Sequence, residues 1–382
     1  MKRFFAVFFF LTNAACASEE IFPALGDELA NPESMVVDSV ARRLYVVNSN
    51  SLIGFEPNQG SFQVYDITDV QNPVLLGTAA TESLSGELVL DSANQRAIVA
   101  NRYSVDGTVT NDHLLSINVD EASADFLHVT EIETALDPYA VACCTAANQM
   151  LFTAKNGVLQ YTDLDDATLS VESLDLLQDL SNGGSISQAT LRDVVVSGSQ
   201  AFVVRNEGGI YVINLDELGV SGKNPVDYFI ADVRAPRSMA VDGNNLYITD
   251  YDSISGHHQF RVLILDVSSL VALPDNDDVE YLDKDDAGLV AGSVEVGDNP
   301  QNIIISGTQA FVGNYDDDTV SVIDLNSNTV TATIAVGDRP FSFAIDAPAA
   351  VDTTLFVGNL EDNSLTMIDL DSLNVLSTFT GP

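Results

Sequence analysis

Basic side chains are scarce in this chain, and many of them fall at recurring places. The sequence contains 15 Lys and Arg residues against 56 Asp and Glu residues. Several basic residues follow a short apolar run directly or lie at the start of the next one. These residues are Arg102, Lys155, Arg192, Arg205, Arg234, Arg237 and Arg339. Guanidinium forks match the oxygens of carboxylate, phosphate and sulfate groups. The distribution therefore predicts a site for a small anion wherever these side chains converge.

Acidic residues at similar places allow a second interpretation. Glu33, Glu87, Asp193 and Asp250 lie near the same boundaries between runs. If each carboxylate pairs with one of the cations, the basic residues hold the fold together and bind no ligand. The sequence leaves both interpretations open.

The apolar runs that carry these residues belong to one repeated unit. A run such as Leu44–Asn48 ("LYVVN") or Ala310–Asn314 ("AFVGN") is followed by a second run that ends in Asp or Asn. The pattern occurs seven times, at spacings of 45 to 64 residues. The second residue of the run is Tyr45, Ile98, Phe152, Phe202, Tyr247, Phe311 and Phe356 in turn. A unit of fixed order and about fifty residues indicates a repeat architecture.

Each unit is expected to form four strands. The runs are short, rich in β-branched and aromatic residues, and bounded by Asp, Asn, Gly and Ser, a composition typical of strands. A four-stranded antiparallel sheet repeated around an axis is a propeller blade. The sequence therefore predicts an all-β protein, a single seven-bladed β-propeller of four-stranded antiparallel blades over residues 21–382.

The propeller arrangement brings one position of every unit to the same face. The start of the first strand and the end of the second strand both lie around the mouth of the central channel. The residue after the proline that often opens the first strand is therefore expected there in all seven blades. It is Glu33, Gly86, Tyr139, Arg192, Arg237, Gln301 and Phe341 in turn.

The repeats resemble those of a known family. Tyr45–Asn48 reads "YVVN", the third strands carry a "V-I-D" pattern, and "VGDNP" (Val296–Pro300) and "VGDRP" (Val336–Pro340) precede two of the units. These motifs resemble the YVTN-repeat β-propellers, which are surface and periplasmic proteins of bacteria and archaea. The resemblance covers nearly all of the chain after its N-terminal segment. It implies an exported propeller.

Two functions remain in view. The first is a non-enzymatic binding or scaffold propeller, which takes a small anion or a protein partner at the channel mouth. Its expected ligand-binding residues are Lys155, Arg192, Arg205, Arg237, Arg102 and Arg339. The second is a lactonase-like hydrolase, because seven-bladed lactonases resemble this architecture. Glu33 or Glu87 would then be the base, and Arg192 or Arg237 would hold the substrate anion.

The N-terminal segment predicts where the protein is located, and the overall charge limits its partners. Residues 1–17 contain Lys2, Arg3 and an apolar stretch followed by small residues, which is typical of a signal peptide. Cys16 could alternatively carry the lipid of a bacterial lipoprotein. The expected location is periplasmic, outer-membrane-anchored or extracellular, with membrane contact only through Cys16. The formal net charge of −41 excludes nucleic acid as a partner of the bulk surface.

No cofactor and no metal site are expected. The chain lacks tryptophan, and its three cysteines and four histidines show no ligand spacing. Adjacent Cys143 and Cys144 are expected to be two small side chains without a disulfide bond. The acidic segment 273–292 is expected to form a loop after the third strand of the fifth unit. It lacks the full ligand pattern of a calcium loop.

Overall fold

The structure is a computed structural model that describes residues 28–382 except 50–58, 83–84, 104–109, 167, 177–189, 255–256, 274–278, 286 and 348–352. The expected signal peptide, Cys16 and the rest of the segment before residue 28 lie outside the described residues. Within the described part, no helix is long and apolar enough to span a bilayer.

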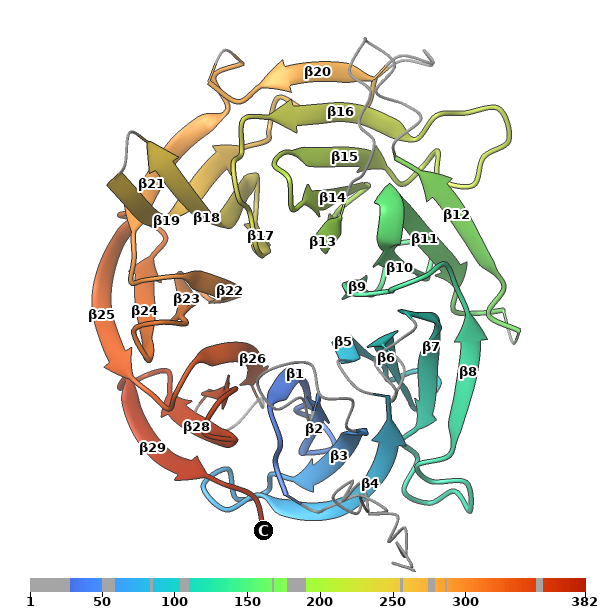
Figure 1. Ribbon diagram of the computed structural model, residues 1–382, viewed down its shortest axis with the longest axis vertical. Coiled ribbons are helices and arrows are strands. Elements are labelled where there is room, and N and C mark those ends of the chain that lie inside the picture. The colour runs from blue at the N-terminus through green and yellow to red at the C-terminus, as the bar shows by residue number, and fades with distance from the viewer. Residues whose placement is uncertain are drawn as a thin grey trace, which may run out of the picture.

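The chain forms seven antiparallel sheets arranged in a ring, which confirms the predicted seven-bladed propeller (Figure 1). Blade 1 consists of β1 (Pro32–Asp38), β2 (Arg43–Asn48), β3 (Gly60–Asp66) and β4 (Val74–Thr81). Blade 2 consists of β5 (Ser85–Asp91), β6 (Arg96–Tyr103), β7 (Thr110–Asn118) and β8 (Val129–Glu133). Blade 3 consists of β9 (Val141–Ala142), β10 (Gln149–Ala154), β11 (Val158–Asp163) and β12 (Val171–Asp175), with a short 3-10 helix, η1 (Lys155–Gly157), after β10.

The remaining four blades follow in chain order. Blade 4 consists of β13 (Leu191–Ser197), β14 (Gln200–Arg205), β15 (Ile210–Asn214) and β16 (Val226–Ala231). Blade 5 consists of β17 (Met239–Asp242), β18 (Asn245–Ile254), β19 (His257–Asp266) and β21 (Val290–Glu295). Blade 6 consists of β22 (Pro300–Ser306), β23 (Gln309–Asn314), β24 (Thr319–Asp324) and β25 (Thr329–Ala335). Blade 7 consists of β26 (Pro340–Asp346), β27 (Thr354–Asn359), β28 (Ser364–Asp369) and β29 (Asn374–Phe379).

The core lies between neighbouring blades. Phe202 of blade 4 packs in one apolar cluster with Met239 and Leu246 of blade 5, and Phe311 of blade 6 packs with Phe343 of blade 7. The seven residues at the second position of the repeated run are all at most 3% exposed. Burial of such large apolar side chains from both faces of each sheet is the main force that holds blade to blade.

Buried asparagines tie the ends of the second strands to the rest of each blade. Asn314 accepts a hydrogen bond from the Gly297 N–H (3.1 Å) and donates to the hydroxyls of Thr319 and Ser321 (2.9 Å each). Asn359 donates in the same way to Ser364 and Thr366. Asn residues that end a strand usually bond to their own backbone in turns, whereas these two cross-link neighbouring strands of the blade.

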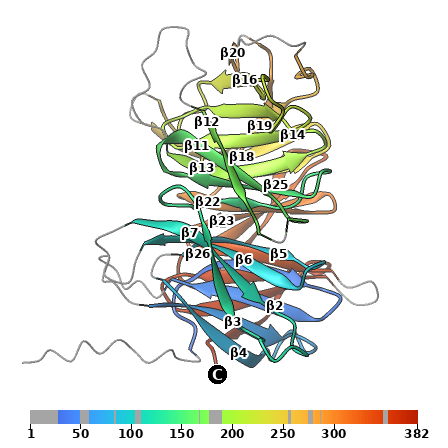
Figure 2. The same cartoon turned by 90° about the vertical axis from the view of Figure 1, so that its right-hand side faces the viewer.

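The ring closes without a blade shared between the two chain ends. Blade 7 has its own fourth strand, and blades 1 and 7 lie side by side in both views (Figures 1 and 2). The Asn31 side chain donates to the Leu360 carbonyl at 2.6 Å, and the Ser342 hydroxyl donates to the Pro32 carbonyl at 2.7 Å. Packing and hydrogen bonds across this seam therefore close the propeller. From the sequence, the apolar residues 21–25 are expected to add a contact at the outer edge of the ring, and they lie outside the described residues.

Two local expectations are wrong. The acidic segment 273–292 is more than a loop, because it contributes β20 (Glu280–Asp283), which pairs in parallel with β16 and gives blade 4 a fifth strand. Cys143 and Cys144 are joined by a disulfide. The pairing of β20 joins parts of two different blades, and residue types alone do not predict such a contact.

Candidate functional site

The first strands of the blades surround a central cavity of about 180 Å³. All seven residues at the position after the strand-opening proline line it: Glu33, Gly86, Tyr139, Arg192, Arg237, Gln301 and Phe341. Side chains alternate along a strand, so this position faces the axis in each blade. The lining is therefore set by the repeat itself, one residue from each blade.

The next residue along these strands links one blade to the next. The Ser34 hydroxyl accepts from the Leu88 N–H at 3.0 Å, the Glu87 carboxylate accepts from the Val141 N–H at 3.1 Å, and the Asp193 carboxylate accepts from the Met239 N–H at 2.6 Å. Two acidic residues singled out in the sequence thus have structural partners. Asp250 also has structural partners, because it accepts from the Ala235 N–H at 3.2 Å and pairs with Arg261 at 2.8 Å. The structural interpretation therefore holds for Glu87, Asp193 and Asp250.

Glu33 lies across the channel from two arginines. In a ring of seven blades, the side opposite blade 1 is occupied by blades 4 and 5, as Figure 1 shows for β1, β13 and β17. Glu33 and Arg192 are the second residues of β1 and β13, and Arg237 lies just before β17. The cavity is therefore acidic at one end of a diameter and basic at the other.

Arg192 and Arg237 form no ion pair and no side-chain hydrogen bond with the described residues. Both side chains are half-buried in the cavity wall. Arg192 lies against the Tyr139 ring, with 5.8 Å between the guanidinium carbon and the ring centre. Burial lowers the pKa of Arg237, and the positive charge of Arg192 lowers it further. These two cations lie side by side, and an anion between them would relieve their repulsion.

Glu33 retains its proton more readily than an ordinary carboxyl. Burial raises its pKa to about 7, although Arg102, a hydrogen bond with Ser49 and Arg192 each oppose the rise. Burial likewise raises the pKa of Glu87, with the Asp193 charge adding to the effect, and raises that of Asp193 to about 6. Partial protonation of Glu33 near neutral pH leaves the positive charge of the arginines incompletely balanced.

The other expected site residues lie elsewhere. Arg102 lies on the Tyr139 ring (4.5 Å) and pairs with Asp137 (3.1 Å), so it supports the cavity wall. Lys155 is exposed in η1. Neither residue belongs to the cavity lining.

Arg205 and Arg339 also lie outside the lining. Arg205 lies over Phe229 at 5.2 Å. Arg339 lies over Tyr315 at 5.1 Å and forms an ion pair with Glu361. Tyr315 in turn contacts the lining residue Phe341. The structure thus brings together Arg192 and Arg237, with Arg102 next to them behind Tyr139.

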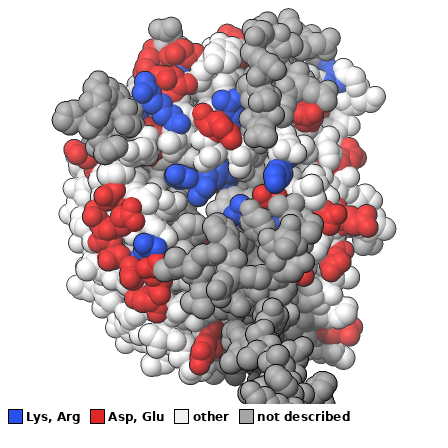
Figure 3. Space-filling view, viewed as in Figure 1, with Lys and Arg blue, Asp and Glu red and all other residues white. Residues whose placement is uncertain are grey.

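Polar and aromatic lining residues were not singled out from the sequence as ligand groups. Gln301, Ser238 and Asn302 add hydrogen-bonding groups beside the arginines, and Phe341 adds an aromatic ring. Their position in the repeat, at or next to the residue after the strand-opening proline, could have identified them as lining residues. Figure 3 shows Lys and Arg side chains near the centre of this view and Asp and Glu mainly toward its periphery.

Comparisons with known proteins agree on the fold. No protein-family model and no curated protein matches the sequence. Among solved structures, hydrazine synthase of Kuenenia stuttgartiensis is similar with a TM-score of 0.65 and 12% identity, over 91% of this chain and 97% of that chain. The β-propeller domain of Myceliophteria thermophila Cps50 (Swd1) is similar with a TM-score of 0.63 and 8% identity, over 89% and 97%. Saccharomyces cerevisiae Sqt1 is similar with a TM-score of 0.60 and 9% identity, over 90% and 96%. These structures show that the chain has the seven-bladed β-propeller fold.

Proposed function

We propose that this protein is an exported, non-enzymatic β-propeller that binds a small carboxylate in its central cavity. The observation that carries the proposal is the pair Arg192 and Arg237, two half-buried cations on one cavity wall without an ion-pair partner among the described residues. Hydrogen bonds to charged groups contribute about 1.5–3 kcal/mol, and a guanidinium can give two to one carboxylate.

The size and polarity of the cavity favour a small ligand. A volume of about 180 Å³ is sufficient for a short-chain acid. The strongly negative net charge of the chain keeps polyanions away from the rest of the surface. Specific capture of a small anion therefore requires local cations, and Arg192 and Arg237 supply them.

Calorimetric titration of the full chain with valerate tests the proposal. We expect binding by the native protein and a loss of at least tenfold in affinity for the Arg192→Ala, Arg237→Ala double variant, because the charged contacts are gone. The matched control is Arg234→Ala, Lys223→Ala, which removes two positive charges at ion pairs outside the cavity. Equal affinity of native protein and cavity variant, or equal loss in the control, would contradict a site at the two arginines.

Glu33 supports a second candidate function, the lactonase-like hydrolase. Its carboxyl has a pKa of about 7 and shares the cavity with Arg192 and Arg237, and a general base works best with a pKa near the working pH. Hydrolysis of γ-valerolactone by the native protein, lost in Glu33→Gln, would favour the enzyme. An unchanged rate in Glu33→Gln, or no hydrolysis at all, would leave the binding function.

Export and membership of the YVTN-repeat family belong to the same proposal. The supporting observations are the basic and apolar pattern of residues 1–17 and the repeat motif at Tyr45–Asn48. A periplasmic or surface location would give the cavity direct access to small solutes from the surroundings.

A further inference from the structure

We infer that the ligand is an amino carboxylate, whose carboxylate meets Arg192 and Arg237 and whose ammonium group meets Glu33. This inference rests on the proposed carboxylate-binding function and names the ligand class more closely. The observation behind it is that Glu33 and the two guanidinium groups line the same cavity from opposite blades. Glu87, the other carboxylate in the lining, already accepts a hydrogen bond from the Val141 N–H.

Glu33 differs from the other buried carboxylates because no backbone N–H group of the next blade occupies its oxygens in the described part of the chain. Glu87 and Asp193 accept hydrogen bonds from backbone N–H groups of the next blade. In blade 1 that linking role belongs to Ser34. No hydrogen bond from a neighbouring blade's N–H to Glu33 is present in the described part of the chain, and its side chain lines the cavity. A buried carboxylate with free acceptor positions is best matched by a cationic donor.

Apolar side chains also contribute to the cavity lining. Met35, Leu88 and Phe343 line the cavity together with the rings of Tyr139 and Phe341. Blade 2 contributes Gly86, where a Cβ atom would lie 2.4 Å from the Tyr139 carbonyl oxygen. The Tyr139 backbone occupies the place where a side chain would lie, so only glycine fits at this position. An apolar spacer with opposite charges at its ends fits this lining.

The charge pattern also discriminates against related acids. A dicarboxylate would place its second anion against Glu33, and like charges at short distance are costly. A simple monocarboxylate would leave Glu33 with its hydrogen bond to Ser49 but with no cationic partner from the ligand, which carries a desolvation cost. The amino carboxylate alone gives each end of the cavity an opposite charge.

Three ligands of matched length separate these cases: valerate, γ-aminobutyrate and glutarate. Titration calorimetry of the full chain at pH 8 is expected to show γ-aminobutyrate binding about tenfold or more tightly than valerate, with glutarate weakest. As pH rises from 6 to 8, valerate affinity should fall because Glu33, whose pKa burial raises to about 7, becomes charged. Affinity for γ-aminobutyrate should rise over the same interval.

The Glu33→Gln variant is the key comparison. It should bind valerate and γ-aminobutyrate with affinities within a few-fold of each other and should weaken both pH trends, while Glu87 and Asp193 still titrate nearby. Glu133→Gln changes an exposed carboxyl of β8 and should keep the native preference. Melting temperatures of both variants show whether they are folded.

The outcomes distinguish the inference from the function on which it rests. If all three acids bind equally through Arg192 and Arg237, the carboxylate site stands and the amino-carboxylate inference is overturned. The inference is also overturned if Glu33→Gln retains the native preference. If no acid binds, or binding persists in the Arg192→Ala, Arg237→Ala variant, the proposed function itself fails.

Discussion

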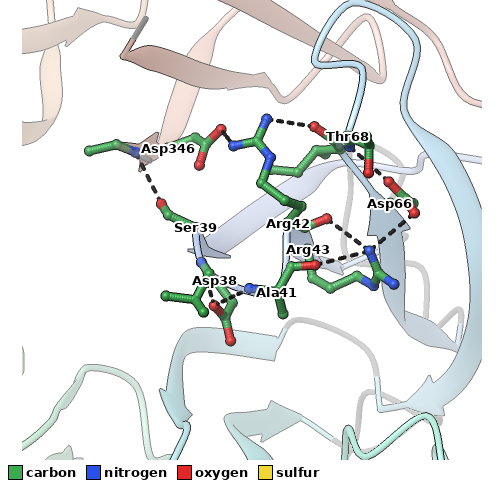
Figure 4. Close-up of polar contacts among 11 residues, drawn as sticks. Asp38, Ser39, Ala41, Arg42, Arg43, Asp66, Thr68 and Asp346 are labelled. Atoms are coloured by element: carbon green, nitrogen blue, oxygen red, sulfur yellow. Dashed lines mark hydrogen bonds and ion pairs between the residues drawn. The ribbon is translucent and has the colours of Figure 1, made fainter. Parts of the chain in front are cut away.

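Arg42 of blade 1 forms an ion pair with Asp346 of blade 7 across the seam where the propeller closes (Figure 4). The Asp346 side chain is 0% exposed, and Arg42 also donates to the Ile67 carbonyl at 2.8 Å. The residue next to Asp346 adds a second link, because the Ala347 N–H donates to the Ser39 hydroxyl at 3.0 Å. One arginine therefore connects the first and last blades without a shared sheet.

We predict that Arg42→Ala destabilises the protein by about 3 kcal/mol, because removal of one partner leaves a buried charge unpaired. The additional change Asp346→Asn should recover more than half of this loss. Arg43→Ala is the control, since Arg43 pairs with the partly exposed Asp66 and Glu121 and such pairs contribute about 0–1 kcal/mol. Urea unfolding measures all three variants. Equal losses for Arg42→Ala and Arg43→Ala would show that the seam does not depend on this pair.

Glu33 should make stability depend on pH. Its pKa is about 7 in the folded protein against an ordinary value of 4.5, so the folded state binds more protons between these values. The resulting stability is fully present below about pH 4.5 and is lost as pH rises through 7. Glu33→Gln should therefore gain about 2–3 kcal/mol relative to the native protein between pH 4.5 and pH 8. Unfolding curves at both pH values measure the gain, and a constant difference would refute the linkage.

The asparagine cross-links should matter more than their polarity suggests. Asn314→Ala removes the partner of the Gly297 N–H and of two hydroxyls, so we expect a loss of about 1–3 kcal/mol in unfolding free energy. Asn326→Ala is the control, because Asn326 is exposed in the turn after β24 and should change stability by less than about 0.5 kcal/mol. A loss no larger than that of the control would assign these asparagines to turn formation.

The mass of the intact expressed protein tests whether it is exported. Expression in a bacterial host should give a product that lacks the first 15 to 17 residues of the printed sequence, as the pattern of residues 1–17 predicts. Membrane association that disappears in Cys16→Ser would identify the lipoprotein form. An uncleaved cytosolic product would contradict export.

The repeat pattern predicted the fold because each blade carries the same local signals. Period-two strands bounded by turn residues, with Tyr45, Phe311 and their equivalents at one position, are sufficient to count seven blades. The parallel pairing of β20 with β16 could not be predicted, because it joins an insertion of blade 5 to the edge of blade 4. Such long-range pairing depends on where the blades lie and not on local sequence.

The site was predicted in part. Repeat position alone placed Glu33, Arg192 and Arg237 on the cavity wall. It could not separate them from Arg205 or Arg339, whose side chains pack on Phe229 and Tyr315 instead. The direction of a long side chain at a strand end depends on its neighbours in three dimensions, and those neighbours come from other parts of the blade.

A crystal structure of the full chain with valerate tests the central claim most directly. The account predicts electron density for a carboxylate between Arg192 and Arg237, with its oxygens within hydrogen-bonding distance of both guanidinium groups. The aliphatic chain should extend toward Glu33. A cavity that contains only water, with the two arginines paired to Glu33 and Glu87, would contradict the claim and assign the basic residues to the scaffold.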